Sequence, residues 1–161
     1  MRPQRQIVGW KELVDLPDLG LLALPAKIDT GAKTSALHVD AVEPFQKADG
    51  TIWVRFQVSD APRMVRGQRL PLTAQLVDTR LVKSSNGESE LRQVIRTTLV
   101  IGTHRHTTEI TLTNRKDMNY PMLVGRTALR AGFLVSPGRS FLLSRDAKKG
   151  KTTSRKKKEP K

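Results

Sequence analysis

The sequence contains no cysteine and few aromatic residues: two Trp, one Tyr and four Phe in 161 residues. Without thiols there is no disulfide framework and no cysteine-based zinc site. A chain of this length can bury a core without disulfides, and here that core must rest on Leu, Val and Ile. The scarcity of aromatic side chains also argues against a surface that stacks nucleic-acid bases.

Several targeting and cofactor signals are missing as well. The N-terminus has no apolar run typical of a signal peptide, and no stretch of about 18 apolar residues is present. We therefore expect no membrane contact and a cytoplasmic location, whose reducing conditions suit a chain without cysteine. There is no His-Glu-x-x-His helix and no Gly-x-x-x-x-Gly-Lys-Ser/Thr loop. The sequence thus predicts no metal and no cofactor.

Positive charge is abundant: 29 Lys and Arg face 15 Asp and Glu, giving a formal net charge of +14. The segment Asp146–Lys161 carries eight Lys or Arg against two acidic residues and has no apolar periodicity. We predict one domain over residues 1–145 and a disordered basic tail over 146–161. The charge favours acidic partners such as acidic peptides, RNA or a ribosomal surface, although solubility alone explains it equally well.

The body of the chain consists of short apolar or alternating runs separated by turns. Lys47–Gly50 ends in Asp-Gly and Ser84–Gly87 in Asn-Gly, both typical of β-hairpins. Only Thr127–Ala131 favours a helix, which Gly132 would stop. This pattern predicts a mainly β chain forming a closed or partly closed barrel with one short C-terminal helix. The expected strands are Leu21–Ile28, Ala36–Phe45, Thr51–Val58, Leu70–Leu81, Leu91–Ile101, Thr107–Thr113 and Pro121–Val124.

Two segments carry the residues suited to chemistry. In the first, Asp29 follows an apolar strand directly, and Gly31 permits the tight turn of a protruding loop. A carboxylate at a rigid strand end would point into a cleft, which makes Asp29 the catalytic candidate. In the second, the apolar residues 122–124 are followed by Gly125 and Arg126 at the start of the short helix.

Together the Asp-Thr-Gly-Ala loop at 29–32 and the Leu-Val-Gly-Arg segment at 123–126 resemble the retropepsin family of aspartic peptidases. The hairpin at 84–87 lies between them, where that family places its flap. The chain also resembles a bacterial branch often labelled "ATP-dependent zinc protease" and associated with ATP-grasp ligases that add glutamates to a ribosomal protein. The resemblance implies a retropepsin-like closed barrel and a peptidase that trims such acidic tails. Further matching segments are Ile7–Trp10, Lys27–His38, Val94–Leu99 and Leu112–Met118.

An aspartic peptidase needs two carboxylates that share one proton, yet this sequence supplies one Asp-Thr-Gly. The second carboxylate must come from a second copy, so we expect a two-fold homodimer with Asp29 beside the partner's Asp29. Thr30 would make the contact between subunits, Gly31 would position the substrate backbone, and the hairpin would close over the peptide. The expected substrate-binding residues are Thr30, Gly31, Ala32, Lys33, Asn86, Gly87 and Arg126.

Lys33 is a departure from the retroviral pattern, which has an acidic residue there to pair with the later Arg. Lys33 and Arg126 together would favour Glu-rich substrates. Alternatively, one or both pair with Asp117, Asp40 or Glu43.

The histidines leave further alternatives open. His38 either binds substrate or tunes Asp29 or, more typically, is a hydrogen-bonded structural residue. His104 and His106 would share a strand face and could bind a metal with Glu109, but residues 103–106 are more typical of an exposed turn. Competing functions are a non-enzymatic basic barrel that binds RNA or a ribosomal surface through its tail, a zinc hydrolase, and a barrel that has lost catalysis.

Overall fold

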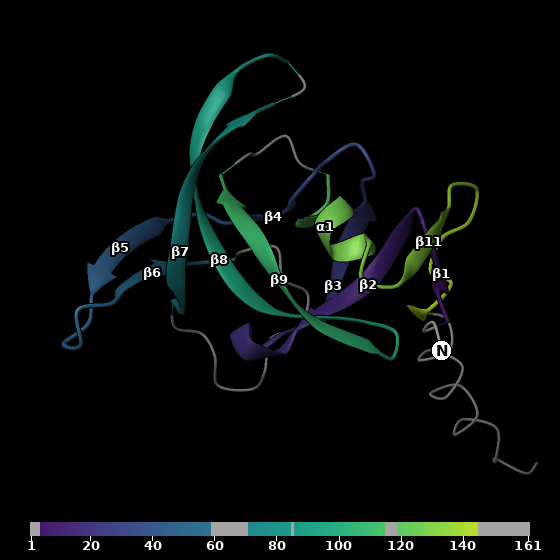
Figure 1. Cartoon of the computed structure of the whole chain (residues 1–161), viewed down its shortest axis with the longest axis horizontal. Helices are drawn as coiled ribbons and strands as arrows, with labels where there is room; N and C mark the ends of the chain where they lie inside the picture. Colours follow the sequence, from purple (N-terminus) through teal and green to yellow (C-terminus); the bar gives the residue numbers. More distant parts are fainter. Residues whose placement is uncertain (1–3, 59–70, 85, 115–118, 145–161) are drawn as a thin grey trace, which may run out of the picture.

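Six strands close into a barrel in the computed structural model, which describes residues 4–58, 71–84, 86–114 and 119–144. The barrel order is β2-β3-β10-β4-β9-β8, and a pairing of Asp15 in β2 with Val100 in β8 closes the ring (Figure 1). This closure covers the edge at β2, where an open sheet would otherwise begin. These strands span Lys11–Leu16 (β2), Leu21–Ile28 (β3), Met122–Val124 (β10), Ser35–His38 (β4), His104–Thr113 (β9) and Ser89–Ile101 (β8).

The short strand β10 joins the two halves of the barrel. It runs parallel to β3, with Met122 opposite Ala26, and antiparallel to β4, with Met122 opposite Leu37. β4 is in turn parallel to β9. The barrel is therefore mixed, and its third strand comes from a segment almost one hundred residues later than the strand beside it.

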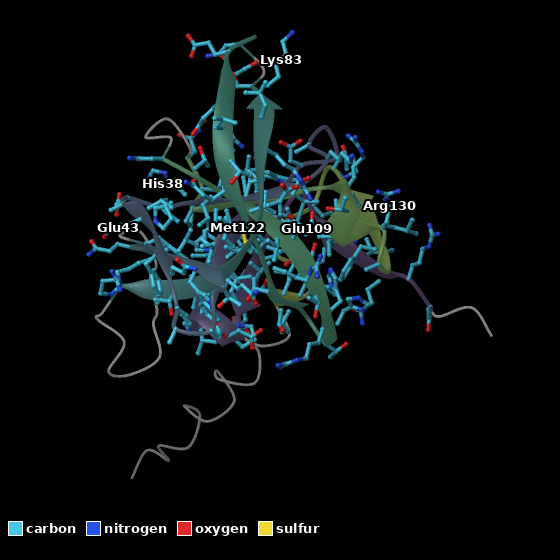
Figure 2. The ribbon with its side chains drawn as sticks, turned by 60° about the vertical axis from the view of Figure 1, so that its left-hand side comes forward. His38, Glu43, Lys83, Glu109, Met122 and Arg130 are labelled. Atoms are coloured by element: carbon cyan, nitrogen blue, oxygen red, sulfur yellow. The ribbon has the colours of Figure 1, made fainter. Side chains whose placement is uncertain are left out.

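Three structures project from the barrel. The β7–β8 hairpin rises above it in Figure 1, and Figure 2 shows Lys83 near the end of this hairpin, far from Met122 in the core. The β5–β6 hairpin extends the sheet beyond β7. β1 and β11 form a separate parallel ribbon. The remaining elements are β1 (Gln6–Gly9), η1 (Pro17–Leu19), β5 (Val42–Gln46), β6 (Ile52–Phe56), β7 (Leu72–Lys83), α1 (Arg126–Leu129) and β11 (Phe133–Ser136).

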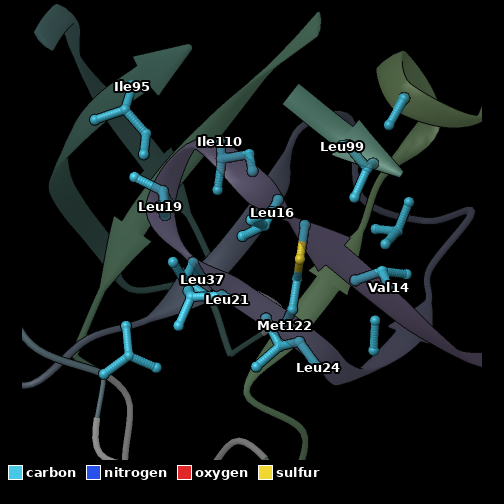
Figure 3. Packing of buried hydrophobic residues seen from close by; sticks show 14 of the residues in the cluster. Val14, Leu16, Leu19, Leu21, Leu24, Leu37, Ile95, Leu99, Ile110 and Met122 are labelled. Carbon is cyan, nitrogen blue, oxygen red and sulfur yellow. The ribbon is translucent and has the colours of Figure 1, made fainter. Parts of the chain in front are cut away.

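Aliphatic side chains fill the barrel (Figure 3). The alternation of β8 and β9 turns one set of residues inward and leaves the other for the outer wall, as expected for period-two strands. Among aromatic residues, Phe56 and Phe133 are buried with them. The expectation of a Leu, Val and Ile core is thus confirmed; its fully buried members include Leu16, Leu21, Leu24, Leu37, Ile95, Leu99, Ile101 and Ile110.

One carboxylate lies inside the fold. Glu12 is fully buried on the inward side of β2. Its Oε1 accepts N–H groups of Gly9, Leu142 and Leu143 at 3.0, 2.7 and 3.2 Å, and its Oε2 accepts the N–H and hydroxyl of Ser144 at 3.3 and 2.7 Å. Glu12 therefore ties the segment after β11 to the barrel.

The predicted fold class is confirmed: mainly β, a closed barrel and one short helix. The expected strand 36–45 is instead two strands, β4 and β5, because the chain leaves the barrel between them. The helix spans Arg126–Leu129 rather than 127–131. The N-terminal strands β1 and β2, and β11, were not predicted.

None of the described helices is long and apolar enough to span a bilayer. The predicted domain end at 145 and the predicted basic tail lie outside the described residues.

Candidate active site

Asp29 lies at the point where β3 ends. Its N–H donates to the carbonyl of Val124 in β10 at 2.9 Å, so the backbone is still held by the neighbouring strand. Its carboxylate is half-buried, and Oδ1 accepts the N–H of Gly31 at 3.0 Å. A Cβ at position 31 would lie 3.2 Å from Oδ1, so glycine leaves the carboxylate uncrowded. This is the strand-end geometry that the sequence predicts.

The segment after β10 holds the loop from behind. The N–H of Gly125 donates to the Ser35 hydroxyl at 3.0 Å, and the N–H of Arg126 donates to the carbonyl of Ala32 at 2.8 Å. A Cβ at position 125 would lie 2.7 Å from the carbonyl carbon of Thr34. Only glycine fits that approach, because a side chain there would push the loop away.

Arg126 adds a side-chain brace. One terminal nitrogen of its guanidinium donates to the carbonyl oxygens of Thr30 and Gly31, at 3.1 and 3.2 Å. Neither Asp40 nor Glu43 is its partner: Asp40 lies 3.9 Å from His38, and Glu43 lies 3.9 Å from Arg55. Asp117, the third expected partner, is outside the described residues. The two motifs are therefore one structural unit, in which the later segment fixes the shape of the earlier loop.

A cleft of about 1200 Å³ opens beside Asp29, between the loop and the β7–β8 hairpin. The loop contributes Gly31, Ala32 and Lys33, and the hairpin contributes its β7 side up to Ser84. Figure 2 shows Glu109 on the barrel wall below the hairpin that carries Lys83. The described lining is Lys27, Asp29, Gly31, Ala32, Lys33, Thr34, Ala36, Arg80, Leu81, Val82, Lys83, Ser84, Arg92, Glu109, Thr111, Asn119, Tyr120, Leu123 and Thr127.

Four of the predicted substrate-binding residues lie outside this lining: Arg126, described above, and Thr30, Asn86 and Gly87. Asn86 and Gly87 form the turn of the hairpin: the Asn86 side chain accepts from the Ser84 hydroxyl and from the Glu88 N–H, and Gly87 has a left-handed φ of +87°. Thr30 is exposed at the tip of the loop. Their positions suit contacts made when the hairpin closes or a second copy binds, and those roles stay predictions.

The cleft is positively charged. Its described lining has the cations Lys27, Lys33, Arg80, Lys83 and Arg92, against the carboxylates of Asp29 and Glu109.

Glu109 is not a second catalytic acid. Arg80 and Arg96 lie 2.6 and 3.4 Å from its two oxygens. The hydrogen bond from Arg80 is the main cause that holds the pKa of Glu109 below its usual value. Asp29, by contrast, has no described cation within ion-pair distance. Asp29 is the carboxylate of this cleft that is open to a reactant.

The histidines do not join this site. His38 is buried on β4, and its Nε2 lies 3.9 Å from Asp40, which supports a structural role. The exposed turn expected at 103–106 is wrong for the histidines: Thr103 lies in an exposed turn, but His104 and His106 lie on β9 with ring centroids 5.0 Å apart, packed against Phe133. Burial, and secondarily His104, lowers the pKa of His106.

A metal site shared with Glu109 is also excluded by the strand geometry. Glu109 is an odd number of residues from both histidines, so β9 directs it to the opposite face. No cluster of three or more metal-ligating side chains was found in the described part of the chain.

Arg92 is a cleft residue that sequence reasoning missed. It is only 6% exposed and pairs in register with Arg80 of the hairpin. Its neighbours in sequence, Leu91 and Gln93, give no signal of burial, because Arg92 is covered only once β7 lies beside β8.

Comparison with known proteins gives three findings. Residues 7–146 match the family described as "RimB-like: Retropepsin-like aspartic endopeptidase RimB". The chain is 41% identical over 143 residues to a "Probable alpha-L-glutamate ligase" of Shewanella pealeana, covering 89% of this chain but 31% of that protein. A relative of the same name from Desulfotalea psychrophila is 39% identical over 137 residues, which cover 83% of this chain and 28% of that protein.

The third finding is structural. The fold matches a crystal structure of a Legionella pneumophila protein of unknown function with a TM-score of 0.69 and 29% identity, covering 85% of this chain and 97% of that one. The chain spans less than a third of the length of the curated relatives and nearly all of the solved structure.

Proposed function

Because the chain belongs to the RimB-like family of retropepsin-like aspartic endopeptidases, we propose that it acts as a homodimer in which Asp29 of each copy completes one catalytic pair. The observation that carries this proposal is the solitary Asp29 in a cleft whose other described acid, Glu109, is held by two arginines. A single carboxylate cannot both activate water and donate a proton to the scissile carbonyl in one step. A second copy supplies the missing group.

In the proposed mechanism the two carboxylates share one proton, because like charges about 3 Å apart cannot both ionise cheaply. The ionised carboxylate takes a proton from a water molecule as that water attacks the peptide carbonyl carbon. The neutral carboxyl gives its proton to the carbonyl oxygen. Collapse of the tetrahedral intermediate then transfers a proton to the leaving amine and restores the pair. The Gly31 N–H bond to Asp29 keeps one oxygen oriented throughout.

The β1–β11 ribbon is the surface that we assign to the dimer contact. Its register partners Ile7 and Leu134 are 53% and 49% exposed, side by side on the ribbon. In each of these strands one edge has no described partner strand. A second copy would cover both the apolar pair and the free edges, which otherwise invite association.

The proposed substrate is an acidic, Glu-rich peptide segment, such as the glutamate-bearing tail of a ribosomal protein. Five cations in the described cleft lining support this, since they would attract and orient carboxylates. The relatives named as glutamate ligases fit this substrate, because a glutamate ligase would join the glutamates that the proposed peptidase removes. The β7–β8 hairpin would close over the bound peptide and exclude water. A contact of the basic tail with RNA or the ribosome, and the cytoplasmic location, stay predictions.

A mixing experiment tests the shared pair. The wild-type chain is held at fixed concentration, and the Asp29→Asn variant is added in increasing excess with time for subunit exchange. Mixed dimers contain one carboxylate, so cleavage of a Glu-rich peptide should fall as the variant accumulates. Undiminished activity at large excess would show that each chain works alone. Leu134→Glu tests the proposed dimer surface. This variant should sediment as a monomer, and it should lose its activity for the same reason.

A further inference from the structure

The arginines around the cleft differ in how many of their hydrogen-bond donors are already engaged by other groups of the protein. Arg126 donates to the carbonyls of Thr30 and Gly31. Arg80 is held on both sides, with its Nε 2.6 Å from Asp78 and a terminal nitrogen 2.6 Å from Glu109. Both guanidinium groups are committed to the fold, so neither offers a substrate its full fork of donors.

Arg92 is in a different position. It lines the cleft and is 6% exposed, yet its Nε has no hydrogen-bond partner among the residues that the structure describes. The acid within reach is Glu90, whose Oε2 lies 3.4 Å away without hydrogen-bond geometry and whose side chain is 44% exposed. The other oxygen of Glu90 accepts a long 3.4 Å bond from the Thr113 hydroxyl. Arg92 is therefore a desolvated cation with a weak partner that solvent can draw away.

An unsatisfied buried cation costs free energy, which a well-placed anion offsets. Arg92 also pairs in register with Arg80, whose charge is balanced by Asp78 and Glu109, so Arg92 is the guanidinium of this pair that remains for an incoming anion. A carboxylate entering the cleft would find donors already fixed by packing, and little side-chain entropy would be lost on binding. Two parallel N–H···O bonds to such a fork are among the stronger polar contacts in proteins.

We infer that Arg92 is a specificity-determining residue: it binds the carboxylate of an acidic substrate side chain in the Asp29 cleft, in competition with Glu90. This inference rests on the proposed function for the identity of the substrate as a peptide. It assigns Arg92 no role in bond cleavage, because it is Asp29 that supplies the reacting carboxylate.

Because Glu90 competes for Arg92, substitutions at the two positions should change the affinity for acidic peptides in opposite directions. Replacement of Arg92 by Gln removes the binding group and should weaken acidic peptides. Replacement of Glu90 by Gln removes the internal competitor and should strengthen them. The matched control is Arg55→Gln, which removes the same charge from an exposed residue of β6 that lies outside the described cleft lining and pairs with Glu43.

The experiment measures binding without turnover. All variants carry Asp29→Asn, and two fluorescent peptides of identical length differ only by Glu or Gln at the acidic positions. Fluorescence anisotropy should show about 10- to 100-fold weaker binding of the Glu peptide to Arg92→Gln, the loss of a charge-assisted pair. The Gln peptide should bind within about two-fold of the parent. Arg92→Lys, which keeps the charge and loses the fork, should recover part of the affinity, and Glu90→Gln should bind the Glu peptide several-fold more tightly.

The inference is overturned if Arg92→Gln weakens both peptides equally, or neither, or if Arg55→Gln gives the same selective loss. Thermal unfolding accompanies every variant. Should Arg92→Gln fail to fold, Arg92→Lys and Glu90→Gln carry the decision, and parent-like binding of the Glu peptide by both would refute the assignment.

Cleavage by the otherwise wild-type chain separates this inference from the proposed function. Selective binding through Arg92 without any peptide cleavage would defeat the proposed function and leave the assignment standing. If the Arg92→Gln variant still cleaves the Glu peptide in preference to the Gln peptide, the assignment of Arg92 is defeated and the proposed function stands.

Discussion

Two carboxylates in this molecule have the same chemistry and opposite surroundings. Glu12 is fully buried and accepts five hydrogen bonds, from four residues. Asp29 is half-buried and, within the described part of the chain, accepts one hydrogen bond, from Gly31. A carboxylate has about four lone-pair sites, so the acceptor capacity of Glu12 is consumed, whereas most of that of Asp29 remains. The number of donors that the fold supplies thus separates an acid that holds the structure together from one that can react.

Strand geometry places each acid in its surroundings. β2 alternates between half-buried and buried residues, and Glu12 occupies one of the inward positions. Asp29 follows the last residue of β3, where alternation ends and the chain turns at the barrel rim. Inside the barrel a carboxylate must be satisfied or it costs several kcal/mol; at the rim, water and reactants satisfy it.

The sharpest test of the comparison is Asp29→Asn. The amide still accepts the Gly31 N–H, so the free energy of unfolding should change by less than about 0.5 kcal/mol. In the proposed dimer the substitution removes both carboxylates, so peptide cleavage should fall by more than the roughly 10²- to 10⁴-fold that one positioned acid or base contributes. Urea unfolding and initial cleavage rates on the same preparation check both parts, and retained activity would remove Asp29 from the mechanism.

Glu12→Gln should do the opposite. One oxygen becomes an NH₂ group that faces backbone N–H donors, so at least one buried donor loses its acceptor. We expect a stability loss of about 2 to 4 kcal/mol and, in the fraction that remains folded, a cleavage rate near that of the wild type. Glu43→Gln, at an exposed acid, is the control. Wild-type stability of the Glu12 variant would show that the buried cluster contributes little.

The fold was predictable where its signals are local, as the contrast between these acids illustrates. Asp-Gly and Asn-Gly mark the two hairpins, and Asp29 follows an apolar run next to glycine. Glu12, however, lies in a short mixed segment, and only Ser144 and its neighbours, more than 130 residues away, make it an interior residue.

Distance along the chain explains the other missed elements. β1 pairs with β11, and the register partners Ile7 and Leu134 are far apart in sequence. Arg92 lies on β8 and becomes buried only when β7, the other strand of the hairpin, lies beside it. The position of Asp29 was predictable because a strand, a turn and a glycine specify it, whereas the second carboxylate that we propose would belong to another copy of the chain.

A third prediction addresses how the loop that carries Asp29 is kept in place. Arg126→Met removes the donor to the carbonyls of Thr30 and Gly31. We expect about 1 kcal/mol of lost stability and about tenfold lower kcat with little change in KM, since the loop that orients Asp29 would loosen. Arg130→Met, at an exposed arginine just after the helix, should change neither. A change confined to KM would instead indicate that Arg126 contacts substrate.

The smallest expected effect concerns Glu109, a carboxylate between the two extremes. The hydrogen bond from Arg80 lowers the pKa of Glu109 in the folded chain. The ion pairs of Glu109 therefore stabilise the fold above the unfolded pKa of about 4.3, and this contribution is lost as pH falls through the lower folded value.

Because both partners are partly exposed, that contribution should be below about 1 kcal/mol. Unfolding at a series of pH values from 6 to 3 should show a shallower acid loss for Glu109→Gln than for the wild type. Parallel curves would mean that the pair with Arg80 is not felt in solution.

The late arrival of β10 in the sequence has a consequence for biogenesis. β3 and β4 flank the Asp29 loop, yet they touch through β10, which begins at Met122. While the polypeptide is being synthesised, the position between β3 and β4 stays unfilled until β10 has emerged. Pairings between strands so far apart in sequence form slowly. The loop that carries Asp29 can thus take its final shape only after residues 122–124 have emerged, well after the loop itself has been made.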